Sequence, residues 1–89
     1  MNKIIKAVLL KNDLLLVAEV IEVMADLGEP NCKLVNPYKI VKNTINDEYT
    51  LESWPDFTYQ NELMVHSDSI LTIADPKPSI AEKYFELTA

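Results

Sequence analysis

The sequence has no arginine, and among its 89 residues there is only one glycine, one cysteine and one histidine. Without arginine, the chain lacks the side chain that best forms paired hydrogen bonds with phosphate or guanine. A single glycine excludes a glycine-rich phosphate-binding loop. Cys32 has no partner for an internal disulfide, and Cys32 with His66 offers too few ligands for a structural zinc site. We therefore expect no cofactor and no metal, and we interpret Cys32 as a small buried hydrophobic residue.

Long apolar runs are also missing. The longest run, Leu14–Ala18, is too short to span a bilayer. The run Ala7–Leu10 is much shorter than the apolar region of a signal peptide. We expect a cytoplasmic protein that makes no membrane contact.

The net charge of −6 is unevenly distributed. Residues 1–45 contain six lysines and five acidic residues, whereas residues 46–89 contain two lysines and nine acidic residues. The second half should repel a phosphate backbone, which weighs against nucleic-acid binding. With a hydrophobic content of 48%, the chain should fold as one domain over residues 1–89. A chain this short often gains stability by oligomerisation.

Catalytic patterns are missing as well. His66 is close to Asp68 in sequence, but no Ser-His-Asp or Cys-His spacing accompanies the pair. We interpret both as solvated turn residues and expect a protein that is not an enzyme.

The remaining patterns predict mostly β structure. Apolar and β-branched residues predict strands at residues 3–11, at residues 32–42 and near residues 49–51. Asn12-Asp13 suits a tight turn, and Pro37 should cause a bulge or an unpaired edge in its strand. Leu63–Ile73 has the pattern of a hairpin, with two apolar arms around the polar turn His66–Ser69. The aromatic residues are interpreted as core or interface residues rather than stacking platforms: Tyr38, Trp54 and Tyr59.

A helix is predicted at the C-terminal end, over Ser79–Leu87. Ser79 is a candidate N-cap, and Glu82 three residues later would complete a capping box. Three apolar side chains would lie along one face of this helix: Ile80, Tyr84 and Leu87.

The segment Leu14–Asp26 is ambiguous from its own residues. Its apolar positions recur at helical spacing, with Asp13 as a possible N-cap and Gly28 as a stop. Val17, Val20 and other branched residues favour a strand instead. Helix and strand therefore both stay open at this point.

The stretch Val65-His66-Ser67-Asp68-Ser69-Ile70-Leu71-Thr72-Ile73 resembles the second sequence motif of the Sm-like (LSm) family, in which two strands flank a tight turn. His66-Ser67 stands where that motif usually has Arg-Gly. Val8–Asp13 resembles the first Sm motif, and Ala18 occupies the position of a glycine at which the second strand bends. Leu34-Val35-Asn36-Pro37 and Ile73-Ala74-Asp75-Pro76 are similar to segments of small phage-encoded Sm-like proteins.

The resemblance implies a mainly β fold: a small, strongly bent five-stranded antiparallel Sm-like barrel or sheet with a short C-terminal helix. It makes Leu14–Asp26 a long, bent strand. It also implies a homo-oligomeric ring in which strand four of one subunit pairs with strand five of the next. The interface residues it suggests lie in the two apolar arms: Leu63, Met64, Val65, Ile70, Leu71 and Ile73.

Sm-like rings commonly bind single-stranded RNA through two loops that face the pore. The positions in this sequence that match those loops are Asn31, His66 and Asp68. The resemblance thus suggests a weak RNA binder in RNA metabolism or phage–host regulation, in a bacterial or phage-infected cell. Two other readings stay open: a structural or protein-interaction module without nucleic-acid binding, and an α+β domain in which Leu14–Leu27 is a helix.

Overall fold

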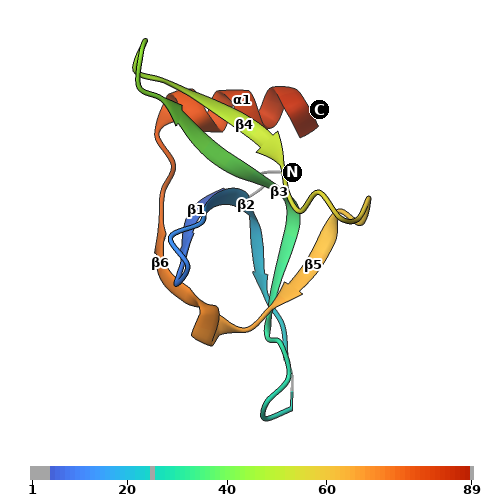
Figure 1. Ribbon diagram of the computed structural model, residues 1–89. Helices are drawn as coiled ribbons and strands as arrows, with labels where there is room; N and C mark the ends of the chain where they lie inside the picture. Colours follow the sequence, from blue (N-terminus) through green and yellow to red (C-terminus); the bar gives the residue numbers. More distant parts are fainter. Residues whose placement is uncertain (1–4, 25, 89) are drawn as a thin grey trace.

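The computed structural model describes residues 5–24 and 26–88 (Figure 1). These residues form antiparallel β-strands, one short 3₁₀ turn and one α-helix. No helix in this part of the chain is long and apolar enough to cross a membrane. The elements in chain order are β1 (Ile5–Leu10), β2 (Leu15–Glu22), β3 (Cys32–Asn43), β4 (Glu48–Ser53), β5 (Glu62–Val65), the 3₁₀ turn (Ser67–Ser69), β6 (Ile70–Ala74) and α1 (Pro78–Thr88).

The mainly β prediction with a short C-terminal helix is confirmed, but the sheet has six strands rather than five. Its order is β4-β3-β2-β1-β6, and β5 pairs with β3 beside β4. β4 pairs with the second half of β3, Tyr38–Asn43, and β5 pairs with the first part, Cys32–Val35. One long edge of β3 is thus covered by two short strands, because the chain leaves the sheet between Ser53 and Glu62.

The predicted hairpin over Leu63–Ile73 is wrong, although both of its arms are strands. β5 pairs with β3 and β6 pairs with β1, so the described residues contain no ladder between β5 and β6. Figure 1 shows β5 and β6 on opposite sides of the curved sheet, joined at one end by the 3₁₀ turn. The sheet is therefore curved but not closed.

The bend of the sheet coincides with the bulge predicted at Pro37. The β2–β3 register changes between Val17, which faces Tyr38, and Glu19, which faces Val35. Asn36-Pro37 thus stands opposite the single residue Ala18, which is fully buried. A β-bulge of this kind bends its strand. Asn36 has a φ of 51°, in the left-handed region that asparagine tolerates better than most residues.

Both faces of β2 are buried in its first half, Leu15–Ala18, which explains the ambiguity of the segment Leu14–Asp26. The strand reading is confirmed over Leu15–Glu22, and a helix over Leu14–Leu27 is wrong. Leu15 and Val17 pack in a cluster beneath α1, which we call the helix cluster; its buried members are Ile5, Val17, Ile40, Ile80 and Tyr84. The next residues along β2 pack in an inner cluster on the other face, whose buried members are Val8, Leu10, Leu16, Ala18 and Leu34. Burial on two faces removes the apolar–polar alternation of an ordinary strand.

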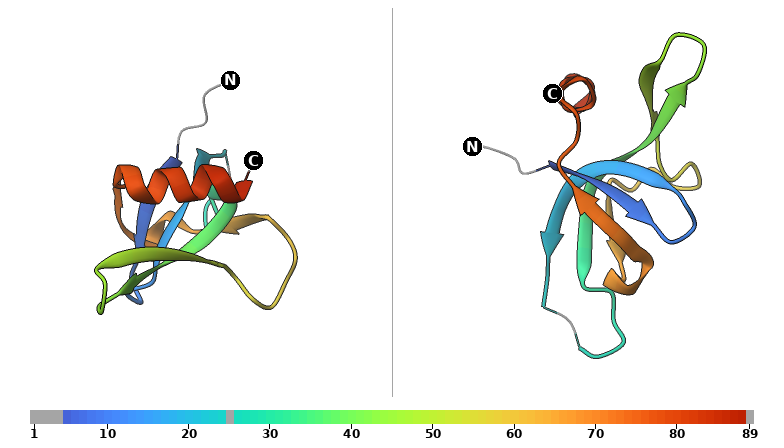
Figure 2. Two further views of the ribbon diagram at one scale, coloured as in Figure 1. Left: turned by 90° about the horizontal axis from the view of Figure 1, so that it is seen from above. Right: turned by 90° about the vertical axis from the view of Figure 1, so that its left-hand side faces the viewer.

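Helix α1 lies across the outer face of the curved sheet (Figure 2). Ile80 and Tyr84 are buried as predicted, whereas Leu87 is 52% exposed and does not join that face. The helix begins at Pro78, and the Lys77 carbonyl accepts hydrogen bonds from the amides of Ile80 and Ala81. Ser79 is therefore inside the first turn rather than at the N-cap, because proline suits the first helical position.

The Tyr84 hydroxyl joins the helix to the bulge. It donates a hydrogen bond to the Val35 carbonyl at 3.0 Å and accepts one from the Glu19 amide at 3.3 Å. Glu19 and Val35 face each other where the β2–β3 register shifts. The hydroxyl thus satisfies backbone groups at the irregularity, and burial raises the pKa of Tyr84 above its ordinary value.

The first strand and its turn are confirmed within the described residues. β1 covers Ile5–Leu10, while Lys3 and Ile4 of the predicted strand lie outside the described part. Asp13 in the following turn has a φ of 66°, the left-handed conformation expected for Asn12-Asp13. The strand near residues 49–51 is also confirmed, as β4.

Candidate functional site

Two loops that are far apart in the sequence meet at one end of the sheet. The first connects β2 to β3, and the second connects β5 to β6. The side-chain carbonyl of Asn31 accepts a hydrogen bond from the Ser67 amide at 2.9 Å, which joins the two loops directly. Together they line a shallow pocket of about 260 Å³, which we call the loop pocket: Asp26, Leu27, Gly28, Glu29, Asn31, His66, Ser67 and Asp68.

The structure brings together the three residues suggested as RNA contacts. Asn31, His66 and Asp68 all line the loop pocket. His66 and Asp68 are exposed, so their side chains can reach a ligand, whereas the carbonyl of Asn31 is occupied by Ser67. Asn31 therefore retains its amide group as a donor for a bound molecule.

The electrostatics of the loop pocket do not favour a phosphate backbone. Three carboxylates line it, from Asp26, Glu29 and Asp68, and no lysine is among its described lining residues. Carboxylates repel phosphates but accept hydrogen bonds from amino groups on base edges. Chemically, this pocket suits a base edge better than a sugar-phosphate chain.

Lysines gather elsewhere, around Tyr49. Lys77 donates to the Tyr49 hydroxyl at 3.3 Å, and Lys83 donates to the Tyr49 carbonyl. Lys42 forms an ion pair with Asp47 at 2.9 Å, which raises the pKa of Lys42 and lowers that of Asp47. This group lies at the start of α1 and beside β4. Its positive charges therefore lie at the β4 edge of the sheet and not at the loop pocket.

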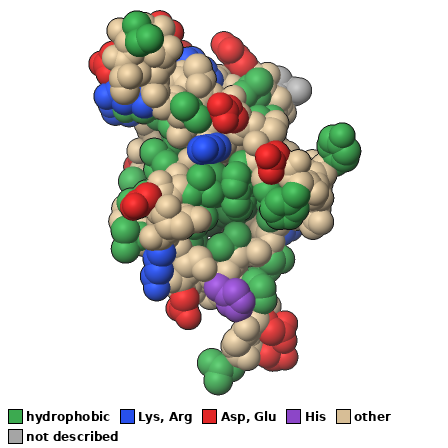
Figure 3. Space-filling view, in the orientation of Figure 1, with side chains coloured by type: hydrophobic (Ala, Val, Ile, Leu, Met, Phe, Trp, Pro, Cys, Tyr) green, Lys and Arg blue, Asp and Glu red, His purple; other side chains and the backbone are tan. Residues whose placement is uncertain are grey.

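The second candidate site consists of the free edges of β5 and β6. In the described residues, β5 pairs only with β3, and β6 pairs only with β1. Met64 is 46% exposed, Leu71 60% and Ile73 47%, although all three are large and apolar. Figure 3 shows hydrophobic side chains gathered at the centre of the face that Figure 1 presents.

The other three residues of the suggested interface are less exposed. Leu63, Val65 and Ile70 are half-buried. Val65 and Ile70 pack against the inner cluster, so part of their surface already supports the fold. The suggested interface therefore divides into three half-buried residues and three with outward-facing apolar surface.

The edge formed by β4 is protected in ways that β5 and β6 are not. β4 has exposed charged residues, Glu48 and Glu52, and contacts α1. The Lys83 ammonium donates a hydrogen bond to the backbone carbonyl of Tyr49 in β4. β5 has one charged residue, Glu62 at its first position, which is paired with Lys33 at 3.0 Å, whereas Leu63–Val65 and Ile70–Ala74 contain none. Proteins commonly place charges or covering elements on edges that must not pair with another chain.

A model of the family of unknown function DUF6561 matches residues 3–89. The chain belongs to this family. No curated protein matches the chain at a significant level.

The main feature of this DUF6561 chain that the sequence did not predict is the exposure of two aromatic side chains in the loop between β4 and β5, residues 54–61. Phe57 is 82% exposed and Tyr59 fully exposed. Tyr59 is therefore not a core residue, and its interpretation as an interface residue stays a prediction. Tyr38 and Trp54 do pack against the helix and inner clusters, as predicted. The only sequence signal was a pair of aromatic residues within a polar stretch.

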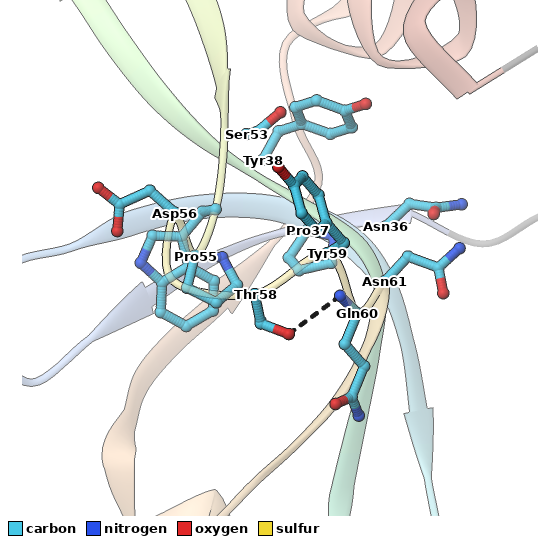
Figure 4. Close-up of a pocket in the computed structure, with 11 residues that line it drawn as sticks. Asn36, Pro37, Tyr38, Ser53, Pro55, Asp56, Thr58, Tyr59, Gln60 and Asn61 are labelled. Atoms are coloured by element: carbon cyan, nitrogen blue, oxygen red, sulfur yellow. Dashed lines mark hydrogen bonds between the residues drawn. The ribbon is translucent and has the colours of Figure 1, made fainter.

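The base of this loop is well anchored. The Asn36 amide donates to the Asn61 carbonyl at 2.7 Å, and the Gln60 amide donates to the Thr58 hydroxyl at 3.1 Å. Pro37 and Pro55 are buried and line a pocket of about 370 Å³ between the loop and β3 (Figure 4). The exposed rings therefore extend from a fixed base, which lowers the entropy lost when they bind.

Cys32 is buried, as predicted. Burial, followed by the nearby Glu22 carboxylate, raises the pKa of its thiol above the ordinary value. A raised pKa disfavours the thiolate, which is the reactive form. This DUF6561 chain thus offers no activated cysteine at that position.

Proposed function

We propose that the protein is an Sm-like subunit that assembles into a homo-oligomeric ring, with β5 of one copy paired to β6 of the next. The observation that carries this proposal is the pair of largely apolar strand edges, Leu63–Val65 and Ile70–Ala74, on opposite sides of one open sheet. Strand edges of this kind readily pair with another chain, and a closed ring leaves none of them exposed.

The strand arrangement supports the Sm-like assignment. β5 (Glu62–Val65) falls within the segment that the resemblance makes strand four, and β6 (Ile70–Ala74) covers the segment that it makes strand five. The register shift opposite Ala18 falls where the resemblance expects the second strand to bend. The 3₁₀ turn Ser67–Ser69 stands at the tight turn of the second Sm motif.

The directions of the strands suit a head-to-tail contact. In Figure 1, β5 runs toward the 3₁₀ turn on one side of the sheet, and β6 runs away from it on the other. When a second copy is placed beside the first in a similar orientation, β6 of the second copy lies next to β5 of the first. The two strands then run in opposite directions, as antiparallel pairing requires. This contact uses different surfaces on the two copies, and contacts of this kind close into a ring when the rotation between successive copies adds up to a full turn.

Lysine substitutions on the β6 edge test the proposed assembly. Leu71→Lys combined with Ile73→Lys should reduce the oligomer to a monomer in light scattering, because charges on an edge strand block strand pairing. Both side chains are substantially exposed, so the fold should persist in circular dichroism. The matched control is Thr50→Lys on the edge strand β4, which should leave the assembly intact. Equal assembly in the double variant and the wild type would contradict the proposal.

A second candidate function is weak binding of single-stranded RNA, and the convergence of Asn31, His66 and Asp68 in the loop pocket favours it. A base can stack on the imidazole of His66 and donate hydrogen bonds to Asp68. A uridine- or adenine-rich oligonucleotide should then raise fluorescence anisotropy at low salt. His66→Ala should weaken the binding about tenfold, since stacking contributes roughly 1–3 kcal/mol per base. No change in anisotropy with the wild type would exclude this function.

A further inference from the structure

The aromatic loop at residues 54–61 presents two exposed rings immediately before an unpaired strand edge. Phe57 is 82% exposed and Tyr59 fully exposed, while Gln60 and Asn61 separate Tyr59 from the start of β5. Exposed aromatic side chains on an anchored loop are typical of binding hot spots. The remaining question is which partner they contact.

The antiparallel pairing proposed above determines which segment of a neighbouring copy lies next to this loop. When β5 and the neighbour's β6 run in opposite directions, the beginning of β5 faces the end of β6. β5 begins at Glu62, directly after the loop, and β6 ends at Ala74. The segment after β6, Asp75–Lys77, leads to α1 and would therefore lie beside the loop.

We infer that Phe57 and Tyr59 dock on the connection between β6 and α1 of the neighbouring copy, an inference that rests on the proposed ring. The occupant of this surface is thus a second copy of the chain. Pro76 offers an apolar ring for an aromatic side chain to pack against, and Lys77 offers an ammonium group for a cation–π contact. In its own subunit, Lys77 already lies 5.1 Å from the centre of the Tyr49 ring.

The charges of the two surfaces are complementary. The loop and the start of β5 carry acidic residues, Asp56 and Glu62, both exposed. On the other side of the contact, the neighbour presents Lys77, also exposed, and the Asp75 carboxylate of the same segment is already paired with Lys6 of its own copy. Opposite charges at the rim of an interface favour the correct register and speed association.

The inference is tested by removing the two rings. Phe57→Ala combined with Tyr59→Ala should lower the association constant at least tenfold in analytical ultracentrifugation, because interface aromatics carry much of the binding energy. The thermal midpoint of the dissociated subunit should not change, since neither ring is buried in it. Ile45→Ala is the matched control, because Ile45 is equally exposed, at 95%, on the β3–β4 turn. This control should assemble like the wild type.

The opposite surface is tested with Lys77→Ala. This variant should also lower the association constant. Adding Lys77→Ala to the double aromatic variant should lower the association constant by a smaller factor than Lys77→Ala does in the wild type, because both changes remove the same contact. Wild-type association in the aromatic variant would overturn this inference while leaving the ring proposal intact. A monomeric wild-type protein would overturn both.

Discussion

Tyr84 is the residue that most directly couples the helix to the sheet. Its ring is 1% exposed and packs edge-on against Tyr38 with 6.0 Å between the ring centres. Its hydroxyl contacts backbone groups on two strands at once. One side chain thus contributes both apolar packing and hydrogen bonding at the point where the sheet bends.

Replacing Tyr84 with phenylalanine should lower the free energy of unfolding by about 1–3 kcal/mol, because the Val35 carbonyl and the Glu19 amide lose their partner. Urea denaturation measures this loss. Tyr59→Phe is the control and should have no effect, since Tyr59 is fully exposed. If Tyr84→Phe unfolds at the same urea concentration as the wild type, the hydrogen bonds of the Tyr84 hydroxyl do not stabilise the fold and the prediction is wrong.

The same substitution has a predicted pH signature. The pKa of Tyr84 is raised by burial, so the folded state favours the neutral phenol. The stability that the hydroxyl contributes is fully present below the ordinary tyrosine pKa of about 10 and declines as the pH rises above it. The stability difference between the wild type and Tyr84→Phe should therefore narrow in strongly alkaline solution.

Among the elements, β3 organises the sheet through its bulge at Asn36-Pro37. On one edge of β3 the pairing with β2 shifts register there, and on the other edge the partner changes from β4 to β5. The left-handed backbone of Asn36 permits this arrangement. The bulge thus determines where the sheet curves and where β5 is placed.

Asn36→Val should destabilise the fold by about 1–3 kcal/mol, because a β-branched residue is strained in the left-handed region. Asn36→Gly should stay close to the wild type, since glycine adopts this conformation freely. Thermal unfolding of the two variants measures the difference. Equal midpoints for valine and glycine would contradict the role assigned to the backbone of Asn36.

Local sequence patterns predicted the elements well and their pairing less well. Branched residues marked the strands, and Asn36-Pro37 marked the bulge, because both depend on conformational preferences of a few adjacent residues. The partners of β5 and β6 depend on contacts across the whole chain, so the apparent hairpin at Leu63–Ile73 was misleading. The strand Leu15–Glu22 needed the fold resemblance, because its apolar positions also fit the spacing of a helix.

The candidate site was predicted to a similar degree. The meeting of Asn31 with His66 and Asp68 came from the resemblance to the Sm-like family, not from their spacing, since 35 or more residues separate Asn31 from the other two. The exposed rings of Phe57 and Tyr59 escaped sequence reasoning, because aromatic residues are usually buried and nothing in the local pattern reveals exposure.

At the scale of the whole molecule, one open sheet contains two largely apolar edges, those of β5 and β6, that are not paired with each other in the described residues. Residues at the β5 and β6 edges have large apolar side chains in contact with solvent, whereas charges and the helix protect the β4 edge. This contrast between the edges is the basis of the assembly proposal. The exposed apolar edges also predict that a single chain aggregates when its assembly is prevented by a change that adds no charge to these edges.

The central claim is self-assembly through β5 and β6, and native mass spectrometry of the wild-type protein at micromolar concentration tests it most directly. The account predicts one dominant species whose mass is a whole-number multiple, three or greater, of the single chain. It also predicts that Leu71→Lys with Ile73→Lys shifts this species to the mass of one chain. A wild-type protein found only at the mass of one chain would contradict the account.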